Sequence, residues 1–167
     1  MKNWFLLFLF FTLGHSLHAQ DFKAQKVKGL PTDEVYALLA DSKGFIWVAH
    51  SLGISRYDGV SFTNFHHPKE MGLGITDLLE DQQGRIWLHN FNGQIFYIEK
   101  EEMHLLKEYR FEQESSFPRM AVLGNELVAS SDKGLFICNT QNLQCKYLYY
   151  DTSNLQTRSL ATVNNIV

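Results

Sequence analysis

The sequence has no excess of positive charge and no long apolar segment. Its 15 Lys and Arg residues stand against 18 Asp and Glu residues, which gives a formal net charge of -3. Nucleic-acid binding needs a basic surface that neutralises phosphates, so DNA and RNA are not expected partners. The apolar run at residues 4–13 is about half as long as the roughly 20 residues that a transmembrane helix requires. We therefore predict no membrane span in this sequence.

Signatures of catalysis and metal binding are also missing. No Gly-x-Ser-x-Gly nucleophile elbow is present. Beyond the N-terminal segment the histidines lack the spacing of three or four convergent metal ligands, and we expect them on the surface or in loops. These histidines are His50, His66, His67, His89 and His104. Glu101 and Glu102 are interpreted as a solvated turn rather than paired glycosidase carboxylates. Taken together, these observations predict no catalytic residue, no cofactor and no metal.

The first twenty residues differ from the rest of the chain. Lys2 precedes the apolar run 4–13, and the polar stretch 15–20 follows it. This order is typical of a secretory signal peptide with cleavage near Ala19, and a permanent transmembrane anchor is the weaker interpretation because the run is short. We expect residues 1–20 to be a signal peptide and the mature chain to be periplasmic or otherwise exported.

Export makes the two cysteines candidates for a disulfide, since an oxidising compartment permits such bonds. If Gln141 and Asn142 form the tip of a hairpin, Cys138 pairs with Cys145 across its two strands. Direct cross-strand partners lie within disulfide range. A disulfide and two unpaired thiols remain the alternatives, while a zinc site is disfavoured because two cysteines fall short of the usual four ligands.

A repeat with a 40-residue step is the most informative feature of the sequence. The segment ALLADSKGFIWV at residues 37–48 recurs as DLLEDQQGRIWL at residues 77–88. The register continues to Gly53 and Gly93, and a third, degraded copy without the Asp and the Trp has Gly134 at 41 residues beyond Gly93. A period near 40 residues indicates either a solenoid or a propeller.

Local patterning favours the propeller. The copies contain short apolar runs between turn residues, without the three-to-four-residue periodicity of helices. In the first copy these runs span residues 35–40, 45–50, 54–57 and 62–65. Four strands joined by three tight turns make one propeller blade. We predict an all-β fold of four-stranded antiparallel blades, with about three blades and the first strand of a fourth.

The predicted blades divide the mature chain, residues 21–167. They span about 28–67, 68–107 and 108–150, and residues 151–167 open the next blade. Since closed propellers typically have four to eight blades, we expect an incomplete propeller that belongs to a longer chain.

The repeated Asp-x-x-Gly-x-x-Trp unit has a structural explanation. Asp favours the first position of a type I turn, where its side chain accepts hydrogen bonds from turn amides, and Gly tolerates the left-handed conformation that follows. The Trp is expected to pack between blades. We therefore predict turn and core roles, rather than ligand or catalytic roles, for six residues: Asp41, Gly44, Trp47, Asp81, Gly84 and Trp87.

Residues 29–59 resemble the two-component regulator propeller repeat. They read GLPTDEVYALLADSKGFIWVAHSLGISRYDG, and that family carries Gly-Leu-Pro, then Asp-x-x-Gly-x-Ile-Trp, then Gly-Leu-x-Arg-Tyr-Asp. The resemblance implies the N-terminal periplasmic sensor region of a sensor histidine kinase or hybrid two-component regulator of the Bacteroidetes type. It implies further blades and signalling domains downstream, and an oligosaccharide or other small molecule as the ligand.

Two other functions remain open from the residues alone. One is an exported glycan-acting propeller enzyme, sialidase- or lyase-like, although the sialidase Asp-box has its Asp and Gly two residues apart and Asp41 and Gly44 are three apart. The other is a non-catalytic scaffold propeller. Ligand binding is expected on loops that enter a blade's first strand, and residues 66–73 and 111–117 are the candidate loops.

Overall fold

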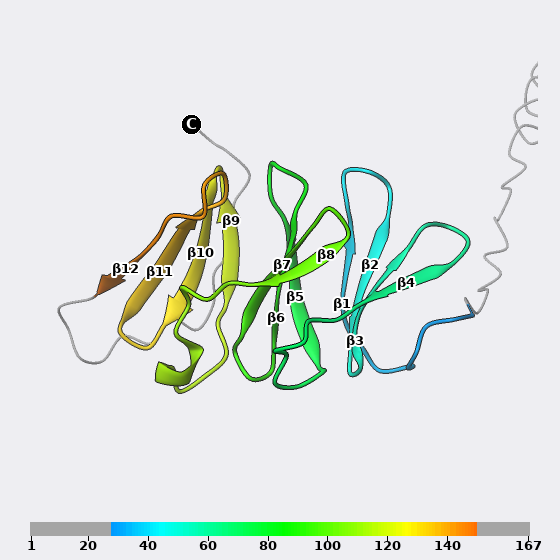
Figure 1. Ribbon diagram of the computed structural model, residues 1–167, viewed down its shortest axis with the longest axis horizontal. Helices are drawn as coiled ribbons and strands as arrows, with labels where there is room; N and C mark the ends of the chain where they lie inside the picture. The colour runs from blue at the N-terminus through cyan, green and yellow to red at the C-terminus, as the bar shows by residue number, and fades with distance from the viewer. Residues whose placement is uncertain (1–27, 150–167) are drawn as a thin grey trace, which may run out of the picture.

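The computed structural model describes residues 28–149, which form three four-stranded sheets (Figure 1). The first sheet contains β1 (Val35–Ala40), β2 (Ile46–His50), β3 (Gly53–Tyr57) and β4 (Phe62–Phe65). The second contains β5 (Ile75–Glu80), β6 (Ile86–Asn90), β7 (Ile95–Glu99) and β8 (Glu102–Leu105). The third contains β9 (Met120–Leu123), β10 (Glu126–Ser131), β11 (Gly134–Asn139) and β12 (Cys145–Tyr149), and the 3₁₀ helix η1 (Phe111–Gln113) precedes it. Among these residues, no helix is long and apolar enough to cross a membrane.

Every sheet is an antiparallel meander whose strands follow the order of the chain. The pairing keeps the 40-residue step of the sequence. Trp47 on β2 lies opposite Leu39 on β1 and Arg56 on β3. Trp87 on β6 lies opposite Leu79 on β5 and Tyr97 on β7. The first two sheets are therefore built on the same register, as expected for propeller blades.

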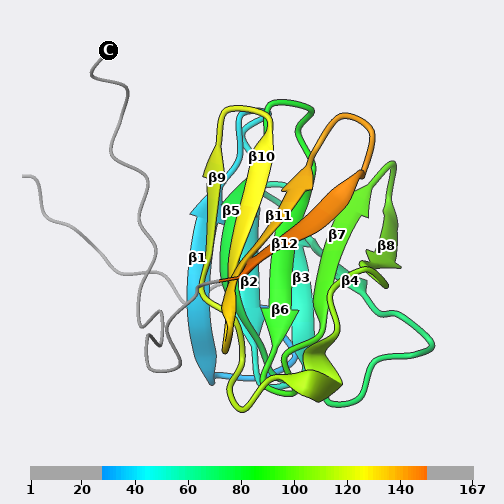
Figure 2. The same cartoon turned by 90° about the vertical axis from the view of Figure 1, so that its left-hand side faces the viewer.

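The three sheets stand side by side in an open arc (Figure 1). Their first strands β1, β5 and β9 lie along one edge of the assembly, while β4 and β8 lie at the opposite edge (Figure 2). Contacts between sheets include β1 with β5 and β5 with β9, so the blades converge along their first strands. This is the arrangement of propeller blades around an axis, with the first strand of each blade innermost.

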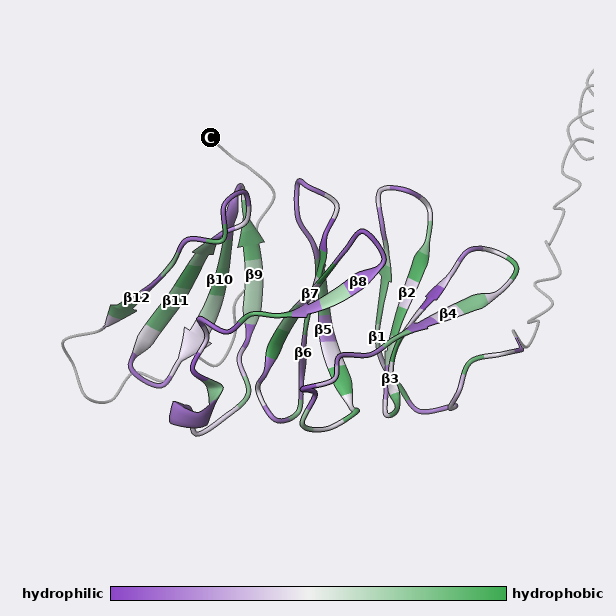
Figure 3. Cartoon of the chain, viewed as in Figure 1, coloured by the Kyte–Doolittle hydropathy of each residue, from purple (hydrophilic) through white to green (hydrophobic). Residues whose placement is uncertain are grey.

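Apolar side chains fill the space between neighbouring blades. Alternate residues of a strand point to opposite faces of the sheet, so the central blade contributes to two cores. Hydrophobic residues lie along strands of all three blades (Figure 3). Leu88 and Phe96 pack toward the first blade, together with Trp47. Trp87 packs toward the third blade, together with Phe136. Each blade thus depends on its neighbour for burial of a face, as in other repeat proteins.

The outward faces of the first and third blades carry exposed apolar side chains. Leu38 and Ile46 are 67% and 42% exposed and point away from the second blade. On the third blade Leu123 and Leu148 are 57% and 46% exposed. In a closed propeller, neighbouring blades cover such faces. The three described sheets do not close into a ring, in agreement with the predicted incomplete propeller.

The fold predicted from the sequence is confirmed in these blades. Strand β2 begins at Ile46 and β3 at Gly53, each within one residue of the predicted bounds. The degraded third copy also forms a full blade, and Gly134 begins β11 as Gly53 begins β3. A Cβ at Gly134 would lie 1.8 Å from the carbonyl oxygen of Leu148, which explains why this glycine persists in the third copy. The predicted signal peptide, residues 1–20, and the predicted fourth blade, residues 151–167, lie outside the described residues.

Candidate functional site

The first Asp-Trp unit closes the turn between β1 and β2. Asp41 Oδ1 accepts hydrogen bonds from the backbone N–H groups of Lys43 and Phe45, at 3.0 and 2.8 Å. Its second oxygen, Oδ2, accepts a hydrogen bond of 2.8 Å from the indole Nε1 of Trp47. Gly44 has φ +87°, a conformation that glycine adopts without strain. One carboxylate therefore holds both the turn and the tryptophan that packs against the next blade.

The second unit repeats this geometry in the next blade. Asp81 Oδ1 accepts from the backbone N–H groups of Gln83 and Arg85, at 2.9 and 3.0 Å, and Asp81 Oδ2 accepts from Trp87 Nε1 at 2.8 Å. Asp81 is 5% exposed and Trp87 fully buried, and Gly84 has φ +73°. Both carboxylate oxygens of Asp81 therefore accept hydrogen bonds from within the blade, which supports the structural role predicted for this unit.

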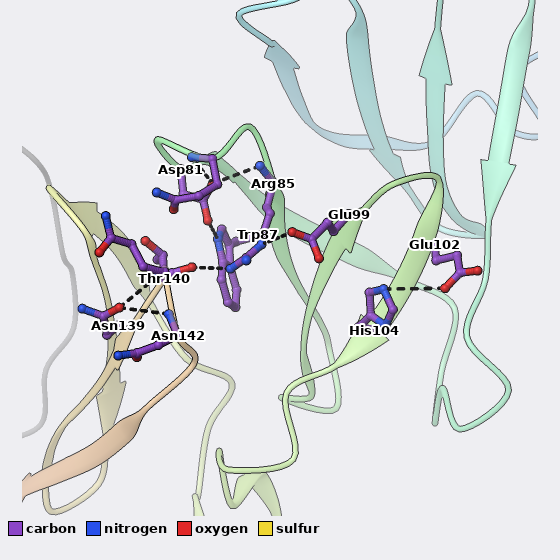
Figure 4. A network of polar contacts seen from close by, with 11 residues as sticks. Asp81, Arg85, Trp87, Glu99, Glu102, His104, Asn139, Thr140 and Asn142 are labelled. Carbon is purple, nitrogen blue, oxygen red and sulfur yellow. Dashed lines mark hydrogen bonds and ion pairs between the residues drawn. The ribbon is translucent and has the colours of Figure 1, made fainter.

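Polar contacts beside the second unit connect the second blade to the third (Figure 4). Arg85 Nε donates to Glu99 Oε1 at 2.9 Å, and its guanidinium also donates to the backbone carbonyl of Thr140. The Arg85 hydrogen bond lowers the pKa of Glu99 below its ordinary value. These contacts lie at the end of the blades that carries the turns β1–β2 and β5–β6, and they stabilise the packing of neighbouring blades.

Glu101 and Arg56 join the first two blades in a similar way. Arg56 donates to Glu101 Oε1 at 2.5 Å, and this hydrogen bond lowers the pKa of Glu101. The side chain of Glu101 is 63% exposed, and that of its neighbour Glu102 is 77% exposed. Glu101 lies in the exposed β7–β8 turn and Glu102 begins β8 directly after it, and the two side chains contact different residues, Arg56 and His104.

The cysteines face each other on the outer strands of the third blade. Cys138 on β11 pairs with Cys145 on β12, the register that the sequence predicts for this hairpin. A disulfide joins the two residues, whose Cα atoms lie 4.0 Å apart. Cys138 is fully buried in the core between the second and third blades. The disulfide therefore links two strands within the third blade, and it lies away from the candidate ligand loops.

The two candidate loops lie at the end of the blades opposite the Asp-Trp units, named here the connection end. Residues 66–74 join β4 to β5, and residues 106–119 join β8 to β9. The side chain of Gln94 fixes the first loop, since its Oε1 accepts from the N–H of Met71 at 2.7 Å and its Nε2 donates to the carbonyl of Lys69 at 2.9 Å. The loop is thus anchored to the turn between β6 and β7.

Three exposed aromatic side chains form a continuous row at the connection end. The rings of Tyr36 and Phe91 lie 5.0 Å apart, and those of Phe91 and Phe117 lie 5.9 Å apart, both edge to face. Their exposed fractions are 39%, 47% and 36%, respectively. This aromatic ridge (Tyr36, Phe91 and Phe117) runs from β1 of the first blade through the β6–β7 turn of the second to the connection that precedes β9. Exposed large aromatic side chains that gather in one place mark a binding surface.

The backbone of Gly74 allows Phe91 to hold this position. A Cβ at residue 74 would lie 2.6 Å from Cδ2 of Phe91, so any side chain here would displace the ring. The backbone N–H of Phe91 donates to the carbonyl of Gly74 at 3.1 Å. Gly74, one residue beyond the candidate loop 66–73, therefore shapes the centre of the aromatic ridge.

A histidine and an aspartate lie beside the aromatic ridge. The ring of His89 stacks on Phe117, with centroids 5.5 Å apart and planes 23° apart. His89 Nε2 lies 3.7 Å from Asp77 Oδ2. His89 is fully buried, whereas the side chain of Asp77 is 28% exposed. Asp77 also accepts a long hydrogen bond of 3.3 Å from the N–H of Met120 on the third blade.

His50 and His89 correct one prediction. Both were expected on the surface or in loops, but His50 is 1% exposed on β2 and His89 is fully buried on β6. His50 ends β2 and His89 is the last residue but one of β6; both make hydrogen bonds inside the packed blades, so the apolar strand context outweighs the polarity of the ring. His66, His67 and His104 are at least partly exposed, as expected.

The pair formed by His50 and Ser55 does not have the geometry of a nucleophile and its base. His50 Nδ1 accepts from the N–H of Leu52 at 3.2 Å, so its proton lies on Nε2, which donates to Ser55 Oγ at 2.8 Å. Ser55 Oγ in turn donates to Asn64 Oδ1 at 2.6 Å. A base must accept the nucleophile's proton, which is the opposite polarity. Burial, and to a lesser extent the charge of His66, lowers the pKa of His50.

Glu70 is an unusual residue of the first candidate loop. Its side chain is 4% exposed, and Oε1 is buried without a hydrogen-bond partner. Its other oxygen, Oε2, lies 3.8 Å from His66 Nδ1. Burial raises the pKa of Glu70 above its ordinary value of 4.5, although the charge of His66 acts in the other direction. The loop therefore keeps a carboxylate at a cost in stability.

Residues 28–149 show two further features. A hollow of about 340 Å³ lies at the outer edge between the second and third blades, where it is lined by His67, Tyr97, His104 and Leu143 among others. Within this part of the chain no three His, Cys, Asp or Glu side chains gather in the manner of a metal site.

Sequence reasoning located part of the connection-end site. The candidate loop 111–117 includes Phe117, but Tyr36, Asp77, His89 and Phe91 lie outside both predicted loops. The 40-residue register holds a signal for two of them, because Asp77 replaces Ala37 in an otherwise apolar strand and Phe91 replaces the turn residue Ser51. Where two copies of the repeat carry different residues, the fold that they share does not require either residue.

Comparisons with known proteins agree with this fold. Residues 29–51 match the family described as two component regulator propeller. No curated protein matches the chain. Among solved structures, the extracellular domain of the hybrid two component system BT4673 from B. thetaiotaomicron has a TM-score of 0.63 and 19% identity. The alignment covers 84% of this chain and 19% of that domain, so the chain spans about a fifth of its length.

Two other solved structures are similar. The extracellular domain of the hybrid two component system BT3049 from B. thetaiotaomicron has a TM-score of 0.59 and 15% identity over 75% of this chain and 20% of its own. Virginiamycin B lyase from Staphylococcus aureus has a TM-score of 0.59 and 19% identity over 74% of this chain and 44% of its own. At these identities the likeness shows the fold alone. Residues 29–51 identify the chain as a carrier of the two component regulator propeller repeat.

Proposed function

We propose that this chain is the N-terminal part of a ligand-sensing propeller that belongs to a two-component sensor histidine kinase. The aromatic ridge carries this proposal, since three exposed aromatic rings at the connection end have no partner among the described blades that would cover them. The family match and the similarity to extracellular domains of hybrid two component systems support it.

The ligand that fits the ridge best is a carbohydrate. The faces of sugar rings combine apolar C–H surface with hydroxyl groups at the edge, which suits aromatic rings with polar groups beside them. Here Asp77 supplies such a polar group next to Phe117. An oligosaccharide lying along the ridge would contact β1, the β6–β7 turn and the connection before β9.

Sensing also requires that the propeller lie outside the cytoplasm. Residues 1–20 would act as the signal peptide that exports it to the periplasm. The remaining blades, a transmembrane helix and the kinase domains would follow in the complete protein. Those domains, and not the propeller, would carry the enzymatic activity.

A glycan-acting enzyme is the competing proposal, and the fold likeness to a lyase is what favours it. Within the described residues, the one serine–histidine pair has the wrong hydrogen-bond polarity for catalysis, as the donation from His50 to Ser55 indicates. A binding role for the connection end needs no such group.

Ligand-dependent phosphorylation of the complete protein tests the sensor proposal. Membranes that contain the full-length protein are incubated with labelled ATP and a series of oligosaccharides. The proposal requires that one oligosaccharide change the rate of autophosphorylation, and that Phe91→Ala abolish the change while leaving the basal rate intact. A complete reading frame without a kinase domain, or hydrolysis of the oligosaccharide by the propeller, would contradict it.

A further inference from the structure

Asp77 adopts a backbone conformation that its strand does not require. It lies on the inner strand β5 with φ +59°, in the left-handed region that residues other than glycine rarely adopt. The pairing of β5 with β6 shifts register between Thr76 and Leu79, which marks a bulge at this residue. Such strain and such bulges cluster at binding sites, where they redirect a side chain.

The hydrogen-bond network assigns the proton of His89. The Nδ1 atom lies 3.0 Å from the carbonyl oxygen of Asn90, which can only accept, so Nδ1 carries the proton. Nε2 is buried and has no hydrogen-bond partner. At 3.7 Å from Asp77 Oδ2, Nε2 lies beyond ordinary hydrogen-bond distance of the carboxylate. The two groups therefore face each other without a hydrogen bond between them.

Buried polar atoms in native proteins nearly always have a partner, so an unpartnered Nε2 beside a carboxylate in a left-handed backbone conformation indicates a missing hydrogen-bonding group. A hydroxyl group can lie within hydrogen-bond distance of two atoms that are 3.7 Å apart. Phe117 stacks over His89 from an exposed position on the 106–119 connection. Phe117 is thus the ring of the aromatic ridge that contacts the His89 imidazole.

The surrounding charges favour a neutral donor over a cation. Arg119 lies with its guanidinium carbon 5.5 Å from the centre of the Phe117 ring. A ligand ammonium group at Phe117 would meet this fixed positive charge, and the attraction of Asp77 would be offset. A hydroxyl group donates one hydrogen bond and accepts others, so two neighbouring hydroxyl groups can serve the two sites without bringing a charge.

We propose that Asp77 and His89 form a hydrogen-bonding subsite for adjacent hydroxyl groups of a neutral sugar ring that packs on the aromatic ridge. One hydroxyl donates to the Asp77 carboxylate and its neighbour forms a hydrogen bond with His89 Nε2, which requires the Phe117 ring to shift off the imidazole while it stays in contact with the sugar. The subsite rests on the proposed function, because the ridge supplies the apolar half of the contact. It adds the ligand class, which is neutral and rich in hydroxyl groups.

An array of immobilised oligosaccharides tests the subsite with the full-length protein. The array holds three chemical classes: neutral sugars, amino sugars with free ammonium groups, and uronic acids. The wild type is expected to bind neutral sugars. Asp77→Asn replaces one acceptor oxygen with a donor group and is expected to weaken this binding at least about tenfold, the loss of one hydrogen bond to a charged acceptor. Glu102→Gln makes the same change at an exposed turn outside the connection end and should bind as the wild type does.

The outcomes separate the subsite from the proposed function. Weaker binding by Phe91→Ala together with unchanged binding by Asp77→Asn would overturn the subsite and leave the ridge as the binding surface. Preference for ammonium sugars would overturn the neutral-ligand assignment, and binding of no sugar would overturn both proposals. Should Asp77→Asn fail to fold, Asp77→Gly removes the same carboxylate at a backbone conformation that glycine adopts freely, and the same tenfold loss is required.

Discussion

Trp87 donates a hydrogen bond of 2.8 Å from its buried indole nitrogen to Oδ2 of Asp81, whose other oxygen caps the turn that leads to the same strand. The equivalent bond in the preceding blade, from Trp47 to Asp41, has the same length. Since Trp87 packs toward the third blade, one carboxylate couples turn formation within a blade to packing between blades. The repeated residues therefore explain the fold, and two departures from the repeat, Asp77 and Phe91, lie in the proposed binding site.

The first prediction concerns the stability of this unit. Asp81→Ala removes three hydrogen bonds to a carboxylate and leaves the buried indole N–H without an acceptor. We expect a loss of about 3 kcal/mol in the free energy of unfolding. Urea unfolding followed by tryptophan fluorescence measures this loss.

Asp58→Ala is the matched control for Asp81→Ala. Asp58 Oδ1 accepts hydrogen bonds from the N–H groups of Val60 and Ser61, but the residue is exposed and contacts no tryptophan. Loss of the Asp58 carboxylate should lower the free energy of unfolding by about 1 kcal/mol, as for other exposed caps. Equal losses at the two positions would show that the indole bond does not contribute.

A second prediction concerns Cys138 and Cys145. The disulfide between them closes a short loop, with a sequence separation of 7. For a loop of this length, chain entropy accounts for about 2–3 kcal/mol of stabilisation. The double variant Cys138→Ala and Cys145→Ala should therefore unfold at lower urea concentration than the wild type. Wild type treated with dithiothreitol should behave like the variant. Alkylation of two thiols in unfolded, unreduced protein isolated from its export compartment would show that the bridge does not form.

A third prediction concerns the pH dependence of stability at Glu70. Its native pKa is raised by burial, so the unfolded chain ionises first as the pH rises above the ordinary value of 4.5. The free energy of unfolding therefore falls between pH 4.5 and the raised native pKa of Glu70, and it stays lower at neutral pH. Glu70→Gln should raise the melting temperature at pH 7 and leave it nearly unchanged at pH 4. A variant that is less stable at pH 7 would show that the ionised carboxylate has a native partner.

Sequence patterns predicted the blades because propeller strands depend on local features. Alternation within four to six residues, together with the glycines and aspartates of the turns, was enough to place β1 and β4 at their observed bounds. The same information could not predict the site. Tyr36, Phe91 and Phe117 lie in three blades, and only the packing of the blades brings them together. The burial of His89 likewise follows from the third blade, which contributes Phe117.

A fourth prediction tests how the fold positions the aromatic ridge. Gly74→Ala places a methyl group 2.6 Å from the present position of the Phe91 ring, so the ring must move. We expect oligosaccharide affinity to fall about tenfold, with a loss of about 1 kcal/mol in stability from overpacking. Gly124→Ala is the control, because Gly124 has φ +58° and no neighbour within 4 Å of an added Cβ. It should lower stability by a similar amount without changing affinity, and equal affinities for both variants would contradict the role of Gly74.

The most direct test of the ligand site is calorimetric titration of the full-length protein with the oligosaccharide that it binds best. The double variant Phe91→Ala and Phe117→Ala removes two of the three rings of the ridge. Tyr149→Ala removes an aromatic side chain of the outer strand β12 that is 65% exposed, more than any ring of the ridge. If the ridge binds the sugar, the double variant loses at least about a hundredfold in affinity, about 1.4 kcal/mol for each ring, and Tyr149→Ala retains the affinity of the wild type. Undiminished binding by the double variant would contradict the account.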